Sequence, residues 1–190
     1  MKITVVGQDP SLRHWGLSKG VYDTVTQELT LSEVLVTEPD LPKGKQVRQN
    51  SLDLESAKQL CEAARSFSKG ADAIFIEVPV GSQSARAMAS YGICVGVVGS
   101  LRAIGIPIFE VSPAEVKLAS SGKTTATKLE MIEWAMNKHP EANWPTYIQK
   151  GKVLVSSAKA EHQADATAAI YAGLASNTFQ QLLPFLKQRQ

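Results

Sequence analysis

The 190-residue chain has few of the features that identify a specialised class of protein. It contains only two cysteines, Cys61 and Cys94, whose spacing indicates no zinc site. Each cysteine lies in an apolar helical pattern, so both are predicted to be buried thiols. The net charge is only +2, so any contact with nucleic acid must come from a local cluster of basic side chains.

Long apolar runs are also absent. The stretch 91–108 comes nearest to the length of a membrane span, but Arg102 and four glycines interrupt it. The first predicted strand begins at Lys2, and no signal or transit segment precedes it. These absences predict a cytoplasmic protein with no membrane partner.

Hydrophobic periodicity predicts a single α/β domain over residues 1–190. Strands are predicted at 2–8, 15–22, 28–37, 73–78 and 107–111. Helices are predicted at 52–68 and 85–103, from 112, and at 126–138 and 158–176. Residues 140–157 are expected to be an irregular loop insertion, and 177–190 a short apolar tail. The predicted fold is a five-stranded mixed sheet, with three early antiparallel strands, then two parallel ones, and helices on both faces.

Four residues that are far apart in the sequence carry the chemical signal. Asp9 and Glu77 each end an apolar strand, and His162 lies three residues before Asp165 on one helical face. Carboxylate oxygens are the ligands that Mg²⁺ prefers, and two such ions about 3.5–4 Å apart promote phosphodiester hydrolysis. These four residues are therefore predicted to be catalytic and to bind two Mg²⁺ (or Mn²⁺) ions, with Asp9 as the bridging ligand.

Each of these signals also has an ordinary structural explanation. An aspartate before Pro10 is often a turn residue, a glutamate at a strand end is often solvated, and a helical His–Asp pair often lies on the surface. A carboxylate that follows a buried strand is nevertheless costly unless something compensates its charge. The agreement among the four residues favours a nuclease.

The same residues, in this order, resemble the motifs of the RuvC family of Holliday junction resolvases in the ribonuclease H-like superfamily. Gly7-Gln8-Asp9-Pro10-Ser11 resembles the opening turn of the family, and Ile74-Phe75-Ile76-Glu77 its strand-end glutamate. His162-Gln163-Ala164-Asp165-Ala166 resembles the histidine version of its closing helix. The resemblance covers roughly residues 2–175. It implies a ribonuclease H-like fold and a homodimeric endonuclease that resolves four-way junctions and other branched DNA.

The resemblance also implies DNA contacts. The segment ending at Lys117 is similar to the family segment that leads to a DNA-contacting lysine, and a second family lysine falls on Lys128. Lys128 is also predicted in the first turn of a helix, where the helix dipole favours phosphate. Each lysine could instead be an ordinary solvated charge. The further candidates for DNA contact are Lys123, Gln83 and Arg86.

Two segments depart from the family pattern. Val80 stands where the family often has an aromatic residue that stacks on a base at the junction centre, so the range of branched substrates stays open. The insertion 140–157 mixes aromatic and cationic side chains, which suits single-stranded or junction DNA, or else a surface loop with a packed tryptophan. These side chains are Trp144, Tyr147, Lys150 and Lys152.

The helix predicted at 85–103 carries small residues along one face, including Gly92, Gly96 and Gly99. Glycine in a helix costs about 1 kcal/mol relative to alanine, so some close contact must offset it. That contact is either the sheet of this chain or the same helix of a second copy. We predict a two-fold symmetric homodimer through this helix.

Other functions are compatible with parts of this pattern. A nuclease of the same fold that processes RNA or RNA–DNA hybrids is one, and a non-catalytic branched-DNA-binding protein is another. The second requires a lost ligand, yet all four site positions are filled. An actin-like ATPase shares the opening of the fold, but such chains are much longer. The resolvase interpretation and the lack of a targeting segment fit a bacterial protein or a phage protein acting in its bacterial host.

Overall fold

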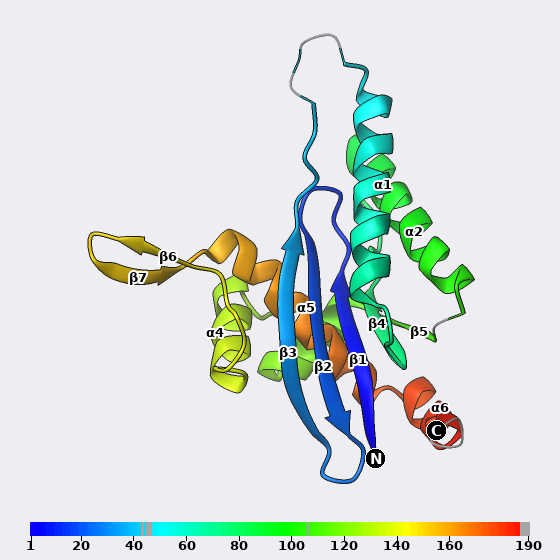
Figure 1. Cartoon of the computed structure of the whole chain (residues 1–190), viewed down its shortest axis with the longest axis vertical. Coiled ribbons are helices and arrows are strands. Elements are labelled where there is room, and N and C mark those ends of the chain that lie inside the picture. The colour runs from blue at the N-terminus through cyan, green and yellow to red at the C-terminus, as the bar shows by residue number, and fades with distance from the viewer. Residues whose placement is uncertain (43, 45–46, 106, 187–190) are drawn as a thin grey trace.

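The computed structural model describes residues 1–42, 44, 47–105 and 107–186. Its centre is a five-stranded sheet in the order β3-β2-β1-β4-β5 (Figure 1). The strands are β1 (Lys2–Asp9), β2 (Trp15–Asp23), β3 (Glu28–Thr37), β4 (Ala73–Glu77) and β5 (Ile108–Val111). The first three pair antiparallel, whereas β1–β4 and β4–β5 pair parallel. The predicted fold class is confirmed.

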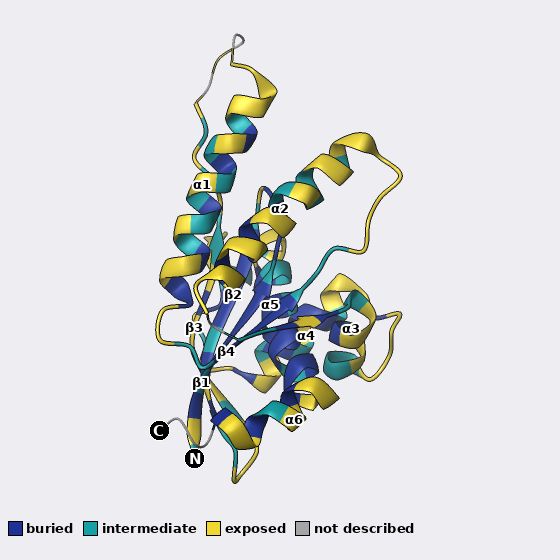
Figure 2. Cartoon of the chain, turned by 90° about the vertical axis from the view of Figure 1, so that its right-hand side faces the viewer, coloured by how far each residue is buried: buried dark blue, intermediate teal, exposed yellow. Residues whose placement is uncertain are grey.

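Helices cover both faces of this sheet, as Figure 2 shows. One face carries α1 (Gln49–Phe67) and α2 (Ala85–Ala103). The other carries α3 (Pro113–Ser121), α4 (Lys128–Lys138), α5 (Ser157–Ala175) and α6 (Asn177–Leu186). Helix α5 contacts β1 and β2 on one side and α3 and α4 on the other, so it is buried along most of its length.

The alternation of side chains along β1 decides which residues meet α5. Ile3 and Val5 belong to the core on the α5 side, whereas Val6 belongs to the core under α1 and α2. In β4, Phe75 faces α5 and Ile76 faces the other way. Successive side chains of a strand point to opposite faces of the sheet. The odd-numbered residues of β1 and β4 therefore face α5.

Glycines let α5 lie unusually close to the sheet. A Cβ atom at Gly7 would lie 1.9 Å from the carbonyl oxygen of Ala166, and one at Gly16 would lie 2.0 Å from that of His162. Any larger residue at either position would push the helix away from β1 and β2. The close approach brings the N-terminal half of α5 against the ends of the central strands.

The expectation that 140–157 is irregular is wrong for ten of its residues. Thr146–Gln149 (β6) and Lys152–Val155 (β7) form a separate antiparallel hairpin. Four-residue strands are too short for a clear periodic signal, and the turn residues Lys150-Gly151 lack the usual asparagine or aspartate. The packed tryptophan, one of the two alternatives for this segment, is observed, because the ring of Trp144 is buried and Nε1 donates to the carbonyl oxygen of His139 at 2.8 Å.

The C-terminal segment also differs from the expected tail. Its described part forms α6, which buries Phe179, Leu183 and Leu186 in the core on the α5 side. Residues 187–190 of the predicted tail lie outside the described residues.

The two cysteines differ from each other. Cys94 is buried, as predicted, but Cys61 is partly exposed, with its Sγ 3.2 Å from Ser100 Oγ. Within the described ranges, no helix is both long enough and apolar enough to cross a membrane.

Candidate active site

Asp9 and Glu77 are the last residues of the neighbouring strands β1 and β4. Strands β1 and β4 are parallel, and Gln8 is paired with Ile76, so the next residue on each strand occupies adjacent places at the same sheet edge. Both are odd-numbered residues whose strands turn odd positions toward α5. The sheet therefore presents two neighbouring carboxylates to this helix.

Helix α5 supplies the other two members of the predicted set. His162 Nδ1 donates a hydrogen bond to Asp9 Oδ2 at 2.6 Å, and Asp165 follows three residues later on the same helical face. Burial opposes the charged imidazolium, but the hydrogen bond from His162 and the charge of Asp9 outweigh it and raise the pKa of His162. The structure thus brings together residues that are 153 positions apart.

Negative charge is under-compensated in this cluster. Burial, followed by repulsion from Asp9, raises the pKa of Glu77 to about 7. Burial and the charges of Asp9, Glu77 and Glu161 raise the pKa of Asp165 to about 8. Lys117 opposes both shifts, but it does not cancel them. A half-buried group of carboxyls with raised pKa values is a common property of functional sites.

The donor set fits a hard divalent cation in its chemistry. Carboxylate oxygens are the ligands for Mg²⁺, and a nearby imidazole nitrogen suits Mn²⁺. A cation would also relieve the repulsion that raises the pKa values of Glu77 and Asp165. Among the described residues, however, no three of these side chains are arranged as a ready coordination group, and Asp9 is hydrogen-bonded to His162 instead.

Three further residues beside the cluster escaped the sequence-based prediction. The ring of His14 stacks on that of His162, with centroids 5.5 Å apart, and its Nε2 lies 3.4 Å from Glu38 Oε1. Glu161 adds its charge to the environment of Asp165. Two signals were available: His14 lies in the loop after Asp9, and Glu161 precedes Asp165 by one helical turn.

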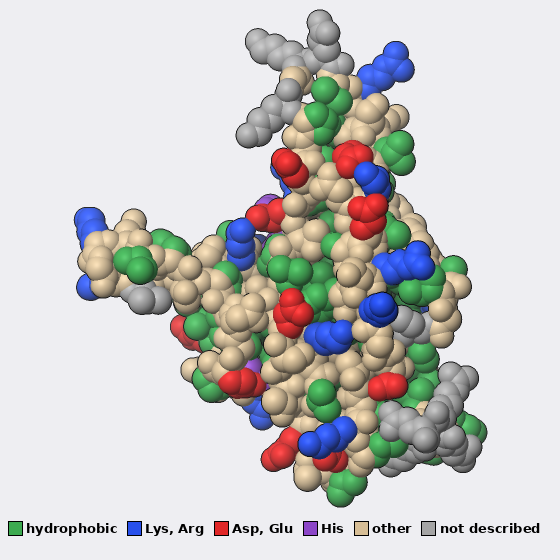
Figure 3. Space-filling view, viewed as in Figure 1, with side chains coloured by type: hydrophobic (Ala, Val, Ile, Leu, Met, Phe, Trp, Pro, Cys, Tyr) green, Lys and Arg blue, Asp and Glu red, His purple; other side chains and the backbone are tan. Residues whose placement is uncertain are grey.

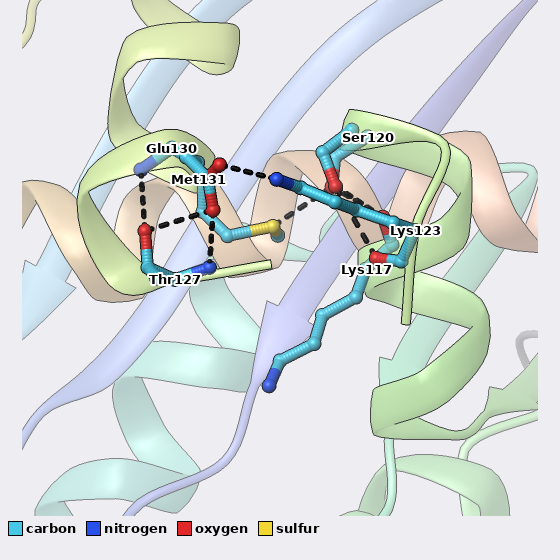
Figure 4. Close-up of polar contacts among 7 residues, drawn as sticks. Lys117, Ser120, Lys123, Thr127, Glu130 and Met131 are labelled. Carbon is cyan, nitrogen blue, oxygen red and sulfur yellow. Dashed lines mark hydrogen bonds and ion pairs between the residues drawn. The ribbon is translucent and has the colours of Figure 1, made fainter. Parts of the chain in front are cut away.

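The three predicted lysines have different surroundings. Lys117, in α3, is near enough to Glu77 and Asp165 for its charge to oppose the rise in both pKa values. Lys128 is the first residue of α4, as predicted, and its Nζ lies 2.5 Å from Glu161 Oε1. Lys123 pairs with Glu130, and Figure 4 shows the side chain of Lys117 directed away from this pair. Lys117 and Lys128 therefore border the acidic cluster, whereas Lys123 is engaged elsewhere.

The remaining candidates lie around the loop between β4 and α2. Arg86 donates two hydrogen bonds of 2.6 Å to Asp53, so its guanidinium ties α2 to α1. Gln83 is exposed just before α2, and Val80 is 82% exposed three residues after Glu77. Val80 and Gln83 are thus accessible from solvent near the strand end, while Arg86 is held by an ion pair.

Several solved Holliday junction resolvases have an architecture similar to that of this chain. RuvC of Thermus thermophilus in complex with a Holliday junction substrate has a TM-score of 0.63 and 19% identity, over 90% of this chain and 92% of that chain. Another Thermus thermophilus RuvC structure has a TM-score of 0.58 and 20% identity, over the same shares. The yeast mitochondrial resolvase Ydc2 has a TM-score of 0.56 and 13% identity, over 98% of this chain and 86% of that chain.

The chain therefore has the fold of the RuvC and Ydc2 resolvases, as the motif resemblance predicted. No protein-family model and no curated protein matches the chain. The likeness is thus one of architecture, and the roles of individual residues must be argued from their surroundings.

Proposed function

We propose that this protein is a metal-dependent, structure-selective endonuclease that resolves four-way DNA junctions and acts on other branched DNA. Its products would carry 5′-phosphate and 3′-hydroxyl ends. Such an enzyme would serve DNA recombination or repair in the bacterial cytoplasm, whether it is encoded by the bacterium or by a phage.

The convergence of Asp9, Glu77, His162 and Asp165 is the observation that carries this proposal. Two strand ends and one helix supply them, and burial together with repulsion between the carboxylates raises the pKa values of Glu77 and Asp165. The shared fold with solved resolvases adds support, because those structures include a complex with a Holliday junction. Neither observation alone would choose a substrate.

Asp9, Glu77 and Asp165 would hold divalent cations, with His162 as a further ligand or a proton carrier. Bound Mg²⁺ or Mn²⁺ supplies Lewis-acid polarisation of a phosphate and a nucleophilic water at neutral pH. His162 meanwhile orients the carboxylate of Asp9 through its Nδ1 hydrogen bond. The protein itself contributes the placement of these groups by the ends of β1 and β4 and by α5.

Lys117 and Lys128 would neutralise phosphates next to the cut. Both lie beside the acidic cluster, and Lys128 begins α4, whose N-terminus favours an anion. Lys128 would exchange its ion pair with Glu161 for a phosphate when DNA binds. Lys123, Gln83 and Arg86 remain weaker candidates for DNA contact, since two of them already hold ion pairs.

Symmetric cutting of a four-way junction requires two active sites, and α2 is the proposed dimer interface. Gly92, Gly96 and Gly99 are exposed, and a Cβ added at any of them would meet nothing within 4 Å. The sheet of this chain therefore does not offset their helix-propensity cost. The exposed side chains of Met88 and Val95 add apolar surface to the same helix. Gly96→Gln should convert a dimer to a monomer in sedimentation experiments.

The central test is cleavage of a labelled synthetic four-way junction with Mg²⁺, with Mn²⁺ or with EDTA. We expect metal-dependent, paired nicks by the unmodified chain, and a loss of at least about 100-fold for Asp9→Asn. Asp40→Asn is the matched control, because Asp40 is exposed and binds Gln59 through its backbone only.

Linear duplex and RNA–DNA hybrid of the same sequence separate the remaining possibilities. Preferred cutting of the hybrid would replace the resolvase by a ribonuclease. Tight junction binding with no cleavage under any metal would leave a non-catalytic binding protein. Junction cleavage that Asp9→Asn does not diminish would contradict the assigned site.

A further inference from the structure

The β6–β7 hairpin stands away from the body of the molecule (Figure 1). Its register pairs Tyr147 with Leu154 and Gln149 with Lys152. Lys150 and Gly151 form the connecting turn with φ values of 51° and 75°. Two successive left-handed residues are typical of a type I′ turn, whose twist matches that of the flanking strands. The segment is therefore an ordered two-stranded ribbon.

The ribbon is anchored at its base. The backbone N–H of Ser156 donates to the carbonyl oxygen of Pro145 at 2.7 Å, which closes the hairpin where it leaves the body. Trp144 is buried directly before it, and α5 begins directly after it at Ser157. The direction of the ribbon is thus set by the core and by the helix that carries His162 and Asp165.

The side chains of β6, from Thr146 to Gln149, are exposed to solvent. Ile148 is 77% exposed and Tyr147 is 47% exposed. Residues paired across an antiparallel ribbon share a face, so Tyr147, Leu154, Gln149 and Lys152 form one surface with an aromatic ring, an amide and an ammonium group. A lone two-stranded hairpin is only marginally stable in water, so such a ribbon gains from a partner.

The positive charge of the hairpin and its flanks indicates that the partner is an anion. Residues 142–160 contain three lysines, Lys150, Lys152 and Lys159, and no aspartate or glutamate. Lys159 pairs with Glu38 at the base, which leaves the charges of Lys150 and Lys152 at the far end. Figure 3 shows basic and hydrophobic side chains next to one another on the projecting hairpin. A polyanion with exposed planar groups matches this surface in both charge and shape.

The position of the hairpin matches a substrate that enters the candidate active site. Four residues of α5 separate Ser157 from His162, and the strands are four residues long. At the usual rises of helix and strand, the hairpin tip lies at most about 25 Å from His162, or about seven nucleotides along one DNA strand. Tyr147 lies near the base of the ribbon and Lys150 at its tip, so they would meet different parts of one DNA molecule.

We propose that this hairpin is a second DNA-binding element that recognises branched DNA beside the cut. Tyr147 stacks on a base left exposed near the branch point, and Lys150 and Lys152 neutralise phosphates of the adjoining arm. This inference rests on the proposed function, because the ligand is the same DNA that the acidic cluster would cut.

Equilibrium binding with EDTA tests this element apart from cleavage, by fluorescence anisotropy of a labelled four-way junction and a linear duplex. The double variant Lys150→Asn/Lys152→Gln should weaken junction binding about 10-fold and reduce the slope of log K against log salt by nearly two. Asparagine is favoured at positive φ, so the turn is retained or improved. Lys2→Gln/Lys69→Gln removes the same charge from exposed positions away from the hairpin and should leave both quantities unchanged.

Tyr147→Ala should weaken junction binding 5-fold or more and leave linear duplex binding nearly unchanged, because only the junction offers unstacked bases. Val25→Ala is its control, since Val25 is an exposed apolar side chain in the turn of the β2–β3 hairpin. Replacement of 146–155 by Gly-Gly should reproduce both losses, because Pro145 and Ser156 already lie within hydrogen-bonding distance.

The outcomes separate the two proposals. If the unmodified chain binds and cuts junctions while the hairpin variants bind as tightly as their controls, the hairpin proposal is overturned and the proposed function stands. If the unmodified chain does not bind junction DNA, both are overturned. Equal losses on junction and duplex by Tyr147→Ala would overturn the stacking role.

Discussion

Asp53 and Asp165 differ in whether the charge of the carboxylate is compensated by a neighbouring side chain. Asp53 belongs to α1, and its side chain accepts two hydrogen bonds from Arg86 of α2 and one from Gln49. The hydrogen bonds from Arg86 hold the pKa of Asp53 below its usual value. Its charge is compensated within the chain, and the pair joins two helices.

The site around Asp165 has the opposite balance. Asp9, Glu77 and Asp165 lie together there, and Lys128 is already paired with Glu161. Burial and mutual repulsion raise the pKa values of Glu77 and Asp165 to about 7 and about 8. Among the described residues, none forms with Glu77 or Asp165 an ion pair comparable to that of Asp53 with Arg86, so these two carboxylates lack its stabilising contribution to the fold. A carboxylate paired within the fold stabilises structure, whereas a cluster left short of positive charge is suited to hold a cation.

The same change at the two sites should have opposite effects on stability. Asp165→Asn removes a repelled charge, so the metal-free chain at pH 8 should melt roughly 5 °C higher, while junction cleavage falls at least about 100-fold. Asp53→Asn weakens the ion pair to Arg86, so the melting temperature should fall by about 3 °C with cleavage largely retained. Calorimetry and the junction assay measure both. A loss of stability in both variants would remove the distinction between the sites.

Divalent cations should stabilise the chain more as pH rises. The carboxyls of Asp165 and Glu77 titrate at 3.8 and 4.5 ordinarily, but at about 8 and about 7 in the fold. Protonation therefore favours the folded chain, and the free energy of unfolding of the metal-free protein falls as pH rises through this window. Mg²⁺ binds the ionised form, so it should raise the melting temperature by at least about 4 °C more at pH 8 than at pH 5.5. Asp165→Asn should lose most of this gain, and a Mg²⁺ effect independent of pH would count against a metal at these carboxyls.

The smallest expected effect is that of the charge of Lys117 on the acidic cluster. Its charge lowers the pKa values of Glu77 and Asp165, so Lys117→Gln should move the pH midpoint of cleavage upward by a few tenths of a unit. Lys123→Gln is the control, because Lys123 pairs with Glu130 and does not act on these carboxyls. Equal shifts in both variants would indicate a general change in DNA binding rather than a local field.

Most of the fold was predictable, because its signals are local. The strands and helices that make up the sheet and its two layers lie close to the predicted ranges, and Ser112 with Glu115 forms a capping box where the helix from 112 was expected. Short elements were missed: β6 and β7 have four residues each, and α6 was expected as a tail. A four-residue strand offers only two positions per face, which is too few to distinguish it from a loop.

The candidate site was only partly predictable for a different reason. Asp9, Glu77, His162 and Asp165 could be selected from their places at strand ends and on a helical face. The Asp53–Arg86 pair could not, since it joins residues 33 positions apart with no local signal. Arg86, a predicted DNA contact, is therefore also a link between two helices. The stacking of His14 on His162 likewise depends on how α5 lies across β1 and β2.

The amino-acid sequence by itself determined the order of the five sheet strands, the burial of β1 and β4, and which side chains could carry metal chemistry, because all of these follow from residue type and spacing. Only the tertiary structure decided which charges are compensated. Gly7 and Gly16 bring α5 within contact distance of the sheet, so Asp9, Glu77 and Asp165 gather in one half-buried cluster whose mutual repulsion is not cancelled, while Asp53 pairs with Arg86. Compensation depends on distances between residues remote in the chain, and packing alone sets those distances.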